Sequence, residues 1–225
     1  YAAYNEVDEA RFVVERIRQW VRDGGSHADC AILYRSNAQS RAFEEALLAE
    51  QVPYRVYGGM RFFERAEIKD ALAYLRLMAN RDDDAAFERA VNTPARGIGE
   101  RTLDEVRRIA RGRAQPLWKA MLGAIDEGVL AGRARNALAG FATLVDTLAE
   151  QTGQMPLAER IDHVLAHSGL REHWAKESKS GLDAESRVEN LDELVSVASR
   201  FARGGDALLD AEEREGMSEL VAFLA

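Results

Sequence analysis

The sequence has little of the chemistry that disulfides and metal centres need. Cys30 is the single cysteine among 225 residues, so no disulfide can form within the chain and no thiol cluster can hold a metal. Two of the four histidines, His163 and His167, stand four residues apart, but HVLAH lacks the glutamate of a zinc-protease helix. We therefore expect no metal ligands, and a reducing compartment, most simply the cytoplasm.

Long apolar runs and a phosphate loop are also missing. No apolar run approaches the ~18 residues that span a bilayer, and no signal-peptide pattern opens the chain, so we expect no membrane partner. None of the 17 glycines is followed by lysine, which excludes a G-x-x-x-x-G-K-[ST] phosphate loop. The chain alone is therefore not expected to be a complete nucleotide hydrolase of that type.

Positive charge is scarce overall but locally concentrated. The formal net charge is −8, which argues against a protein that coats nucleic acid through bulk charge. Residues 141–225 carry −9, whereas residues 81–140 carry +2. A local basic site in the middle of the chain therefore remains open.

The first third of the chain predicts alternating helices and strands. Helical spacing follows Asn5, a suitable N-cap, and short apolar runs at 30–34 and 54–57 have the composition of buried strands. A helix over 36–50 separates the two runs. Strand, helix and strand with short links are typical of a parallel sheet.

From about residue 64 the pattern becomes helical, with an apolar stripe through Ile68, Leu72 and Leu75. The predicted fold class is therefore α/β plus all-α, a partial parallel-sheet domain followed by a helical domain. Further helices are predicted over 84–92, 100–112, 116–125, 130–151, 157–167 and 186–202.

Tyr34 and Arg35 stand at the carboxyl end of the first predicted strand, where parallel sheets bind ligands. The planar guanidinium suits a phosphate, and a tyrosine can stack on a base. Neighbouring strand residues point to opposite faces, so both reach one ligand only if the strand has ended. A solvated arginine beside a half-buried tyrosine explains the same pattern.

A glycine turn between two predicted helices is the second candidate site. Gly97, Ile98 and Gly99 allow a tight turn whose backbone amides approach a phosphate, at the start of a helix whose dipole also favours an anion. This resembles a helix–hairpin–helix grip on a DNA backbone, although an ordinary helical corner would look the same. The flanking residues with suitable side chains are Arg96, Arg101 and Thr102, with further positive charge from Arg107, Arg108, Arg111 and Arg113.

Two weaker candidates complete the set. Arg61, Phe62, Phe63 and Arg65 interleave basic and aromatic side chains, which suits single-stranded nucleic acid but also the packing of a helix start. A second short glycine turn lies between helices at Ser168, Gly169, Leu170 and Arg171.

Three segments make the sequence similar to a known family. AILYRSNAQSRAFEEALL, YRVYGGMRFFERAEIKDALAYLRLMAN and NTPARGIGERTLDEV resemble the middle of the UvrD-type DNA helicases of superfamily 1, the UvrD, Rep and PcrA group. SGLR and SRVENLDELV are similar to that family too. The resemblance implies a 3′-to-5′ ATP-dependent helicase that unwinds duplex DNA in repair or replication, with RecA-like motor domains and inserted helical domains.

The resemblance also implies an organisation and roles. Residues 1–128 would begin the second motor domain, and residues 129–225 would form part of an inserted helical domain. The chain would then be an internal fragment, inactive alone, of an enzyme that uses ATP and Mg²⁺. Its partners would be the junction of single-stranded and duplex DNA, the missing motor domains and DNA-repair proteins.

The family's site residues carry over to positions already singled out. Arg35 matches an arginine that reaches the γ-phosphate of ATP, and Tyr34 matches an aromatic near the adenine. The turns at 97–99 and 168–170 match regions of DNA contact, and residues 61–65 match a motif for DNA contact or domain coupling. Two other function classes stay open on the residues alone, a stand-alone helix–hairpin–helix DNA-binding module and a helical scaffold for protein partners.

Overall fold

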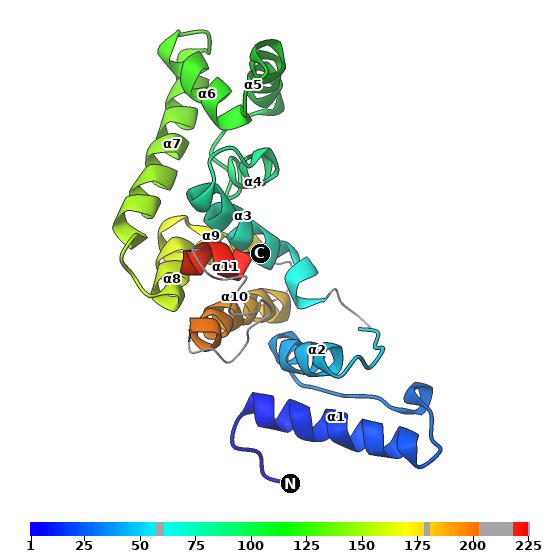
Figure 1. Ribbon diagram of the computed structural model, residues 1–225. Coiled ribbons are helices and arrows are strands. Elements are labelled where there is room, and N and C mark those ends of the chain that lie inside the picture. Colours follow the sequence, from blue (N-terminus) through cyan, green and yellow to red (C-terminus); the bar gives the residue numbers. More distant parts are fainter. Residues whose placement is uncertain (57–60, 178–180, 203–217, 225) are drawn as a thin grey trace. The chain divides into compact units, whose positions relative to one another are not determined.

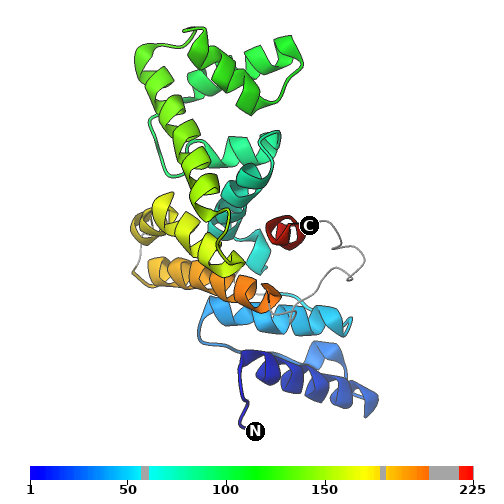
Figure 2. The same ribbon diagram turned by 60° about the vertical axis from the view of Figure 1, so that its left-hand side comes forward.

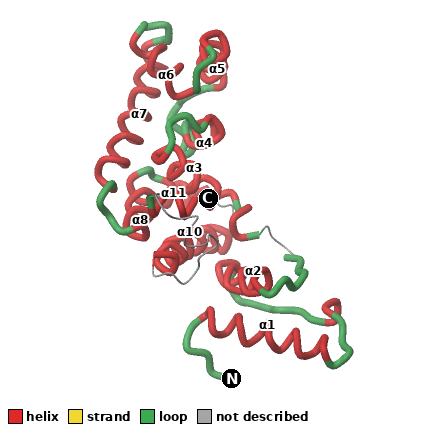
Figure 3. Tube along the Cα trace, in the orientation of Figure 1, coloured by secondary structure: helices red, strands yellow, loops and turns green. Residues whose placement is uncertain are grey.

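The computed structural model describes residues 1–56, 61–177, 181–202 and 218–224. Within these ranges every regular element is a helix, and no β-strand is present (Figure 3). The chain divides into two compact units, Tyr1–Arg65 and Ala66–Ala225. The domain boundary expected between residues 128 and 129 falls inside the second unit, in the turn before α7 (Gly132–Thr152).

The first unit pairs two helices around a small core. Asn5 caps α1 as predicted, because its side-chain oxygen accepts a hydrogen bond of 2.8 Å from the amide of Asp8. Val14, Leu47 and Val52 form the core. The elements are α1 (Glu6–Arg22), η1 (His27–Asp29), η2 (Asn37–Gln39), α2 (Ser40–Ala49) and η3 (Phe62–Glu64).

The predicted strands over 30–34 and 54–57 are wrong, and with them the parallel-sheet part of the predicted fold class. The described residues of both runs are extended but pair with no strand, and residue 57 lies outside the described ranges. In the first run, Ile32 is half-buried against the helical core while Leu33 is 94% exposed. Apolar, β-branched composition therefore indicates only an extended segment with one covered face, since a strand also requires a hydrogen-bonded neighbour.

The second unit is all-helical and is arranged around α3 (Ala66–Ala79). This helix contacts α4, α7, α8, α9, α10 and α11, and it runs through the middle of the unit in both views (Figures 1 and 2). The remaining elements are α4 (Asp84–Ala90), α5 (Glu100–Arg113), α6 (Leu117–Asp126), α8 (Leu157–His167), α9 (Leu170–Glu177), α10 (Gly181–Ala202) and α11 (Glu219–Leu224).

Most helices of this unit match their predictions. α4, α5, α6, α7 and α8 lie within two residues of the expected bounds, whereas α10 begins five residues earlier and α9 was not predicted. Edge-to-face contacts join Tyr74, Phe87, Trp118 and Phe141 in the core. These rings anchor α3, α4, α6 and α7 and so fix the loop that follows α4. Among the described residues, no helix combines the length and apolar character needed to cross a membrane.

Candidate nucleic-acid interface

The first glycine turn joins α4 to α5 and is shaped by its own side chains. Gly97 has φ +74°, a conformation that favours glycine, and Ile98 is only 1% exposed, so it anchors the turn in the core. The side-chain oxygen of Asn92 accepts hydrogen bonds from the amides of Arg96 (2.8 Å) and Ile98 (3.4 Å). The turn is therefore a rigid corner held from inside.

Gly99 is the N-cap of α5 and leaves the start of that helix open. It has no side chain to cap the helix, and a Cβ built on it would meet nothing within 4 Å. The first amides of a helix have no partner within the helix and carry its positive dipole end. The space in front of Gly99 is therefore accessible to an anion such as a DNA phosphate.

The second glycine turn joins α8 to α9 with a similar design. Gly169 has φ +81°, and Leu170, which begins α9, is fully buried. The buried hydroxyl of Ser168 accepts a hydrogen bond of 3.3 Å from the amide of Leu170.

The two turns lie side by side although 70 residues separate them in the chain. A Cβ on Gly169 would lie 3.6 Å from the ring of Pro94, just before the first turn. A groove of about 520 Å³ runs between them, lined by Pro94, Ala95, Arg96, Ser168, Gly169, Glu172, His173, Lys176 and Glu177. The fold thus brings the residues that lead into the first predicted DNA-contact turn against the second.

Arg96 connects these turns rather than facing away from them. Its guanidinium donates to the carbonyl oxygens of Ala90 (3.2 Å), Pro94 (3.0 Å) and Ser168 (3.2 Å), and to the hydroxyl of Tyr74. It also lies 5.5 Å from the ring centre of Phe141. Burial raises the pKa of Tyr74 to about 12, so its hydroxyl stays protonated and neutral beside this cation.

The other residues predicted to contact DNA differ in whether their side chains already have partners within the protein. Arg101 is exposed, and its side chain has no hydrogen-bond or ion-pair partner among the described residues; Thr102, one residue on, is half-buried. Arg171 instead bridges Asp162 and Asp192, with 2.7 Å to each. Arg101 is thus available to DNA as it stands, whereas Arg171 joins α9 to α8 and α10.

Most of the positive charge on α5 is neutralised by carboxylates. Arg107 pairs with Glu88, Glu100 and Asp104, Arg108 pairs with Glu105, and Arg113 pairs with Glu127. These carboxylates raise the pKa of Arg107 well above its usual range. The basic cluster expected from the sequence is therefore mostly a set of ion pairs.

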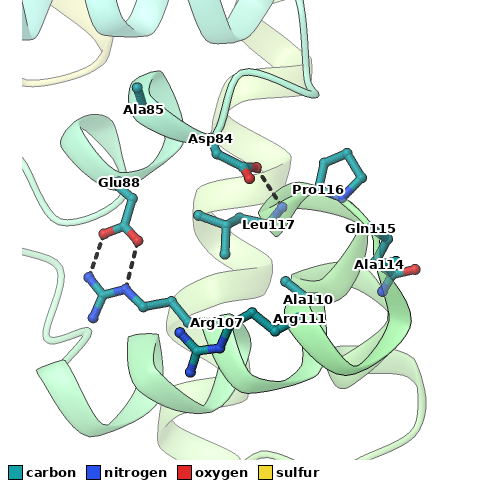
Figure 4. A pocket seen from close by; sticks show the side chains of 10 residues that line it. All are labelled: Asp84, Ala85, Glu88, Arg107, Ala110, Arg111, Ala114, Gln115, Pro116 and Leu117. Carbon is teal, nitrogen blue, oxygen red and sulfur yellow. Dashed lines mark hydrogen bonds and ion pairs between the residues drawn. The ribbon is translucent and has the colours of Figure 1, made fainter.

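A second hollow, of about 570 Å³, lies between α4, α5 and α6 (Figure 4). Most of the charged side chains that line it already have partners within the protein. Glu88 pairs with Arg107, and Asp84 accepts a hydrogen bond of 2.7 Å from the amide of Leu117. Arg111 also lines it and has no partner among the described residues. The two glycine turns remain the better candidate interface.

Comparison with known proteins places these features in a family. The model of the UvrD-like helicase C-terminal domain matches residues 1–224. The chain belongs to that family. It is 56% identical over its whole length to DNA helicase II of Escherichia coli K12 and 54% identical to that of Haemophilus influenzae, covering 30% of each relative. It is 39% identical over 201 residues, 89% of its length, to the ATP-dependent DNA helicase PcrA of Staphylococcus aureus, covering 27% of it.

The chain therefore spans about 30% of the length of these curated relatives. Membership of a helicase domain family does not favour a stand-alone helix–hairpin–helix module or a protein scaffold. The roles of single residues in this UvrD-like chain still depend on where the structure places them.

The two residues expected at ATP lie in the first unit and differ in exposure. Arg35 is exposed, with no side-chain partner among the described residues, whereas Tyr34 is half-buried. The amides of Arg35 and Ser36 both donate to the side-chain oxygen of Gln39, at 3.0 Å, which fixes the backbone before α2.

The segment Arg61–Arg65 of this UvrD-like chain is packed mainly inward. Phe62 is 1% exposed, and buried Arg65 donates to the hydroxyl of Ser40 at 2.6 Å. Arg61 lies 5.2 Å from the ring centre of Tyr54 and, like Phe63, is exposed. Of the four residues singled out in this segment, Arg61 and Phe63 therefore remain accessible to a partner, whereas Phe62 and Arg65 do not.

Sequence reasoning did not single out Arg133, near the start of α7. A Cβ on Gly97 would lie 4.0 Å from a terminal nitrogen of its guanidinium. Arg133 is exposed, and its side chain has no hydrogen-bond or ion-pair partner in the described part of the chain. No local pattern marks it, because 36 residues of folded helices separate it from the turn.

Proposed function

We propose that this chain is part of an ATP-dependent 3′-to-5′ DNA helicase that unwinds duplex DNA in repair or replication. The family membership and the names of the relatives support this activity, which belongs to the intact polypeptide rather than to these residues alone. Its single free cysteine suits an enzyme of the cytoplasm. Its partners would be DNA, the remaining motor parts of the same polypeptide and DNA-repair proteins.

The second unit would hold duplex DNA near its junction with single-stranded DNA. The observation that carries this proposal is that the residues leading into the first glycine turn pack against the second turn, and that each turn opens a helix. Backbone amides at such starts bind phosphate oxygens without reading sequence. Arg101 adds a free cation in the first turn of α5. A grip of this kind suits a helicase, which must accept any sequence.

The first unit would contribute to ATP binding through Arg35. Its exposed guanidinium, unpaired among the described residues, fits a terminal phosphate, to which its planar fork can donate two hydrogen bonds. ATP hydrolysis would supply the free energy for strand separation. The described residues hold no group of three or more His, Cys, Asp or Glu side chains placed for a metal, so we assign no Mg²⁺ ligand to them.

Two variants of the intact polypeptide test the DNA grip. Gly99→Val leaves the fold in place because the site is open, but it blocks close approach of a phosphate, so it should weaken duplex binding. Arg101→Ala should flatten the slope of log K against log salt by about 0.9, the loss expected for one phosphate contact. The measurement is fluorescence anisotropy with a labelled duplex carrying a 3′ single-stranded tail, titrated over salt concentration.

Arg113→Ala is the matched control, because it removes the same charge from the far end of α5, where Arg113 pairs with Glu127 at 2.7 Å. It should bind DNA as the wild type does. Wild-type affinity and slope in both test variants would show that the turn is only a helix corner and that the duplex is held elsewhere.

A further inference from the structure

Arginines around the first glycine turn occupy two different environments. The guanidinium of Arg96 is directed into the protein, where carbonyl oxygens from the loop after α4 and from the end of α8 accept its hydrogen bonds. The guanidinium of Arg133 lies beside Gly97, exposed and without a partner among the described residues. An arginine whose donors are already taken has few left for a phosphate.

We infer that Arg96 is a positioning residue that sets the spacing of the two glycine turns, and that Arg133 is a direct phosphate contact beside the first turn. This inference rests on the proposed DNA grip and assigns its residues. Arg96 is the shared partner of both turns, since it donates to Pro94 on one side and to Ser168 on the other. Arg133 brings charge from α7 to the same place.

The two roles differ in how affinity depends on salt. A cation on a phosphate releases counterions, so losing Arg133 should flatten the salt slope by about 0.9. Backbone amides are neutral and release few counterions. Displacing them by removing Arg96 should therefore lower affinity about tenfold at every salt concentration, a change of about 1.4 kcal/mol, and leave the slope unchanged.

The roles also differ in what lysine can replace. Lysine offers a point charge, which is sufficient for one phosphate, so Arg133→Lys should keep the wild-type slope. Arg96 serves acceptors in several directions through a planar fork, and an ammonium cannot reproduce that geometry. Arg96→Lys should therefore bind as weakly as Arg96→Ala.

The experiment measures binding of the 3′-tailed duplex by the intact polypeptide over salt concentration for these four variants. Arg135→Ala is the matched control, because Arg135 is an exposed arginine on the same helix, with no side-chain partner among the described residues, about 200° around the axis from Arg133. Thermal melting by circular dichroism sets a temperature at which every variant is folded.

The inference stands if Arg133→Ala flattens the slope of log K against log salt and Arg135→Ala does not. It also requires that Arg96→Ala lowers the affinity without changing that slope. It is overturned if Arg133→Ala has the same salt slope as Arg135→Ala, or if Arg96→Ala flattens the slope by about 0.9. It is also overturned if folded Arg96→Ala binds DNA with wild-type affinity. Wild-type binding by Gly99→Val and Arg101→Ala would instead remove the proposed DNA grip itself, which separates the two failures.

Discussion

The second unit contains an ion pair whose carboxylate is buried. Asp70 on α3 is 5% exposed and pairs with Arg89 on α4 at 2.7 Å. Burial raises the pKa of Asp70 above its ordinary value of 3.8, an effect that Glu67 strengthens and that Arg89 and His173 oppose. The ion pair therefore only partly offsets the desolvation of the carboxylate.

Asp70→Asn should change how stability depends on pH. A folded pKa above the unfolded one means that the native state binds the proton more tightly, so this group contributes less stability as pH rises through the folded pKa. The variant lacks that loss, so its unfolding free energy should rise relative to the wild type as pH increases above about 4, the pKa of the unfolded carboxyl. Urea denaturation of both proteins across this range measures the difference. A constant difference, or one that favours the wild type at higher pH, would contradict the prediction.

In the turn between α4 and α5, two glycines separated by a single residue serve different purposes. Gly97 needs a positive φ, whereas Gly99 has φ −78° and faces open space. The first glycine is therefore required by the backbone, and the second keeps the helix start accessible.

Alanine should distinguish these purposes. Gly97→Ala forces a side chain into the left-handed region and should lower the unfolding free energy by about 1–2 kcal/mol. Gly99→Ala should change it by less than about 0.5 kcal/mol. Chemical denaturation monitored by tryptophan fluorescence gives both values. Equal effects would mean that the turn relaxes to accommodate either change.

For the whole molecule, ATP turnover should depend on parts beyond this chain. We expect the isolated chain to show no DNA-stimulated ATPase activity, because its sequence has no phosphate loop to hold the triphosphate. Turnover that survives controls for contaminating ATPases would contradict this.

In the intact polypeptide, Arg35→Ala should lower turnover by about 10³–10⁵-fold while nucleotide binding largely remains. The loss is expected if the guanidinium neutralises charge that develops on the γ-phosphate, and lysine should rescue poorly. Steady-state ATPase assays at saturating DNA, beside a nucleotide-binding titration, test this. A variant with near-normal kcat would reassign Arg35 to a structural role.

Local patterns predicted well what local physics decides. Helical periodicity located α4 to α8 closely, the side chain of Asn5 marked the start of α1, and the glycines marked both turns. The family was also recognisable from the motifs around these residues, and the comparison confirms it. Helical periodicity, the N-cap and the glycine turns each depend on neighbours a few residues away along the chain.

Only the tertiary structure decided the features that depend on residues far apart in the sequence. The extended runs at 30–34 and 54–56 form no strand because a strand needs a paired neighbour, which composition does not supply. The folded core, not the order of residues, sets Pro94 against Gly169 and Arg133 beside Gly97. It also turns Arg96 inward, since carbonyl oxygens from two loops meet where its guanidinium lies. Charge and glycine content in a sequence thus identify candidate contacts, while packing determines which of their donors remain free.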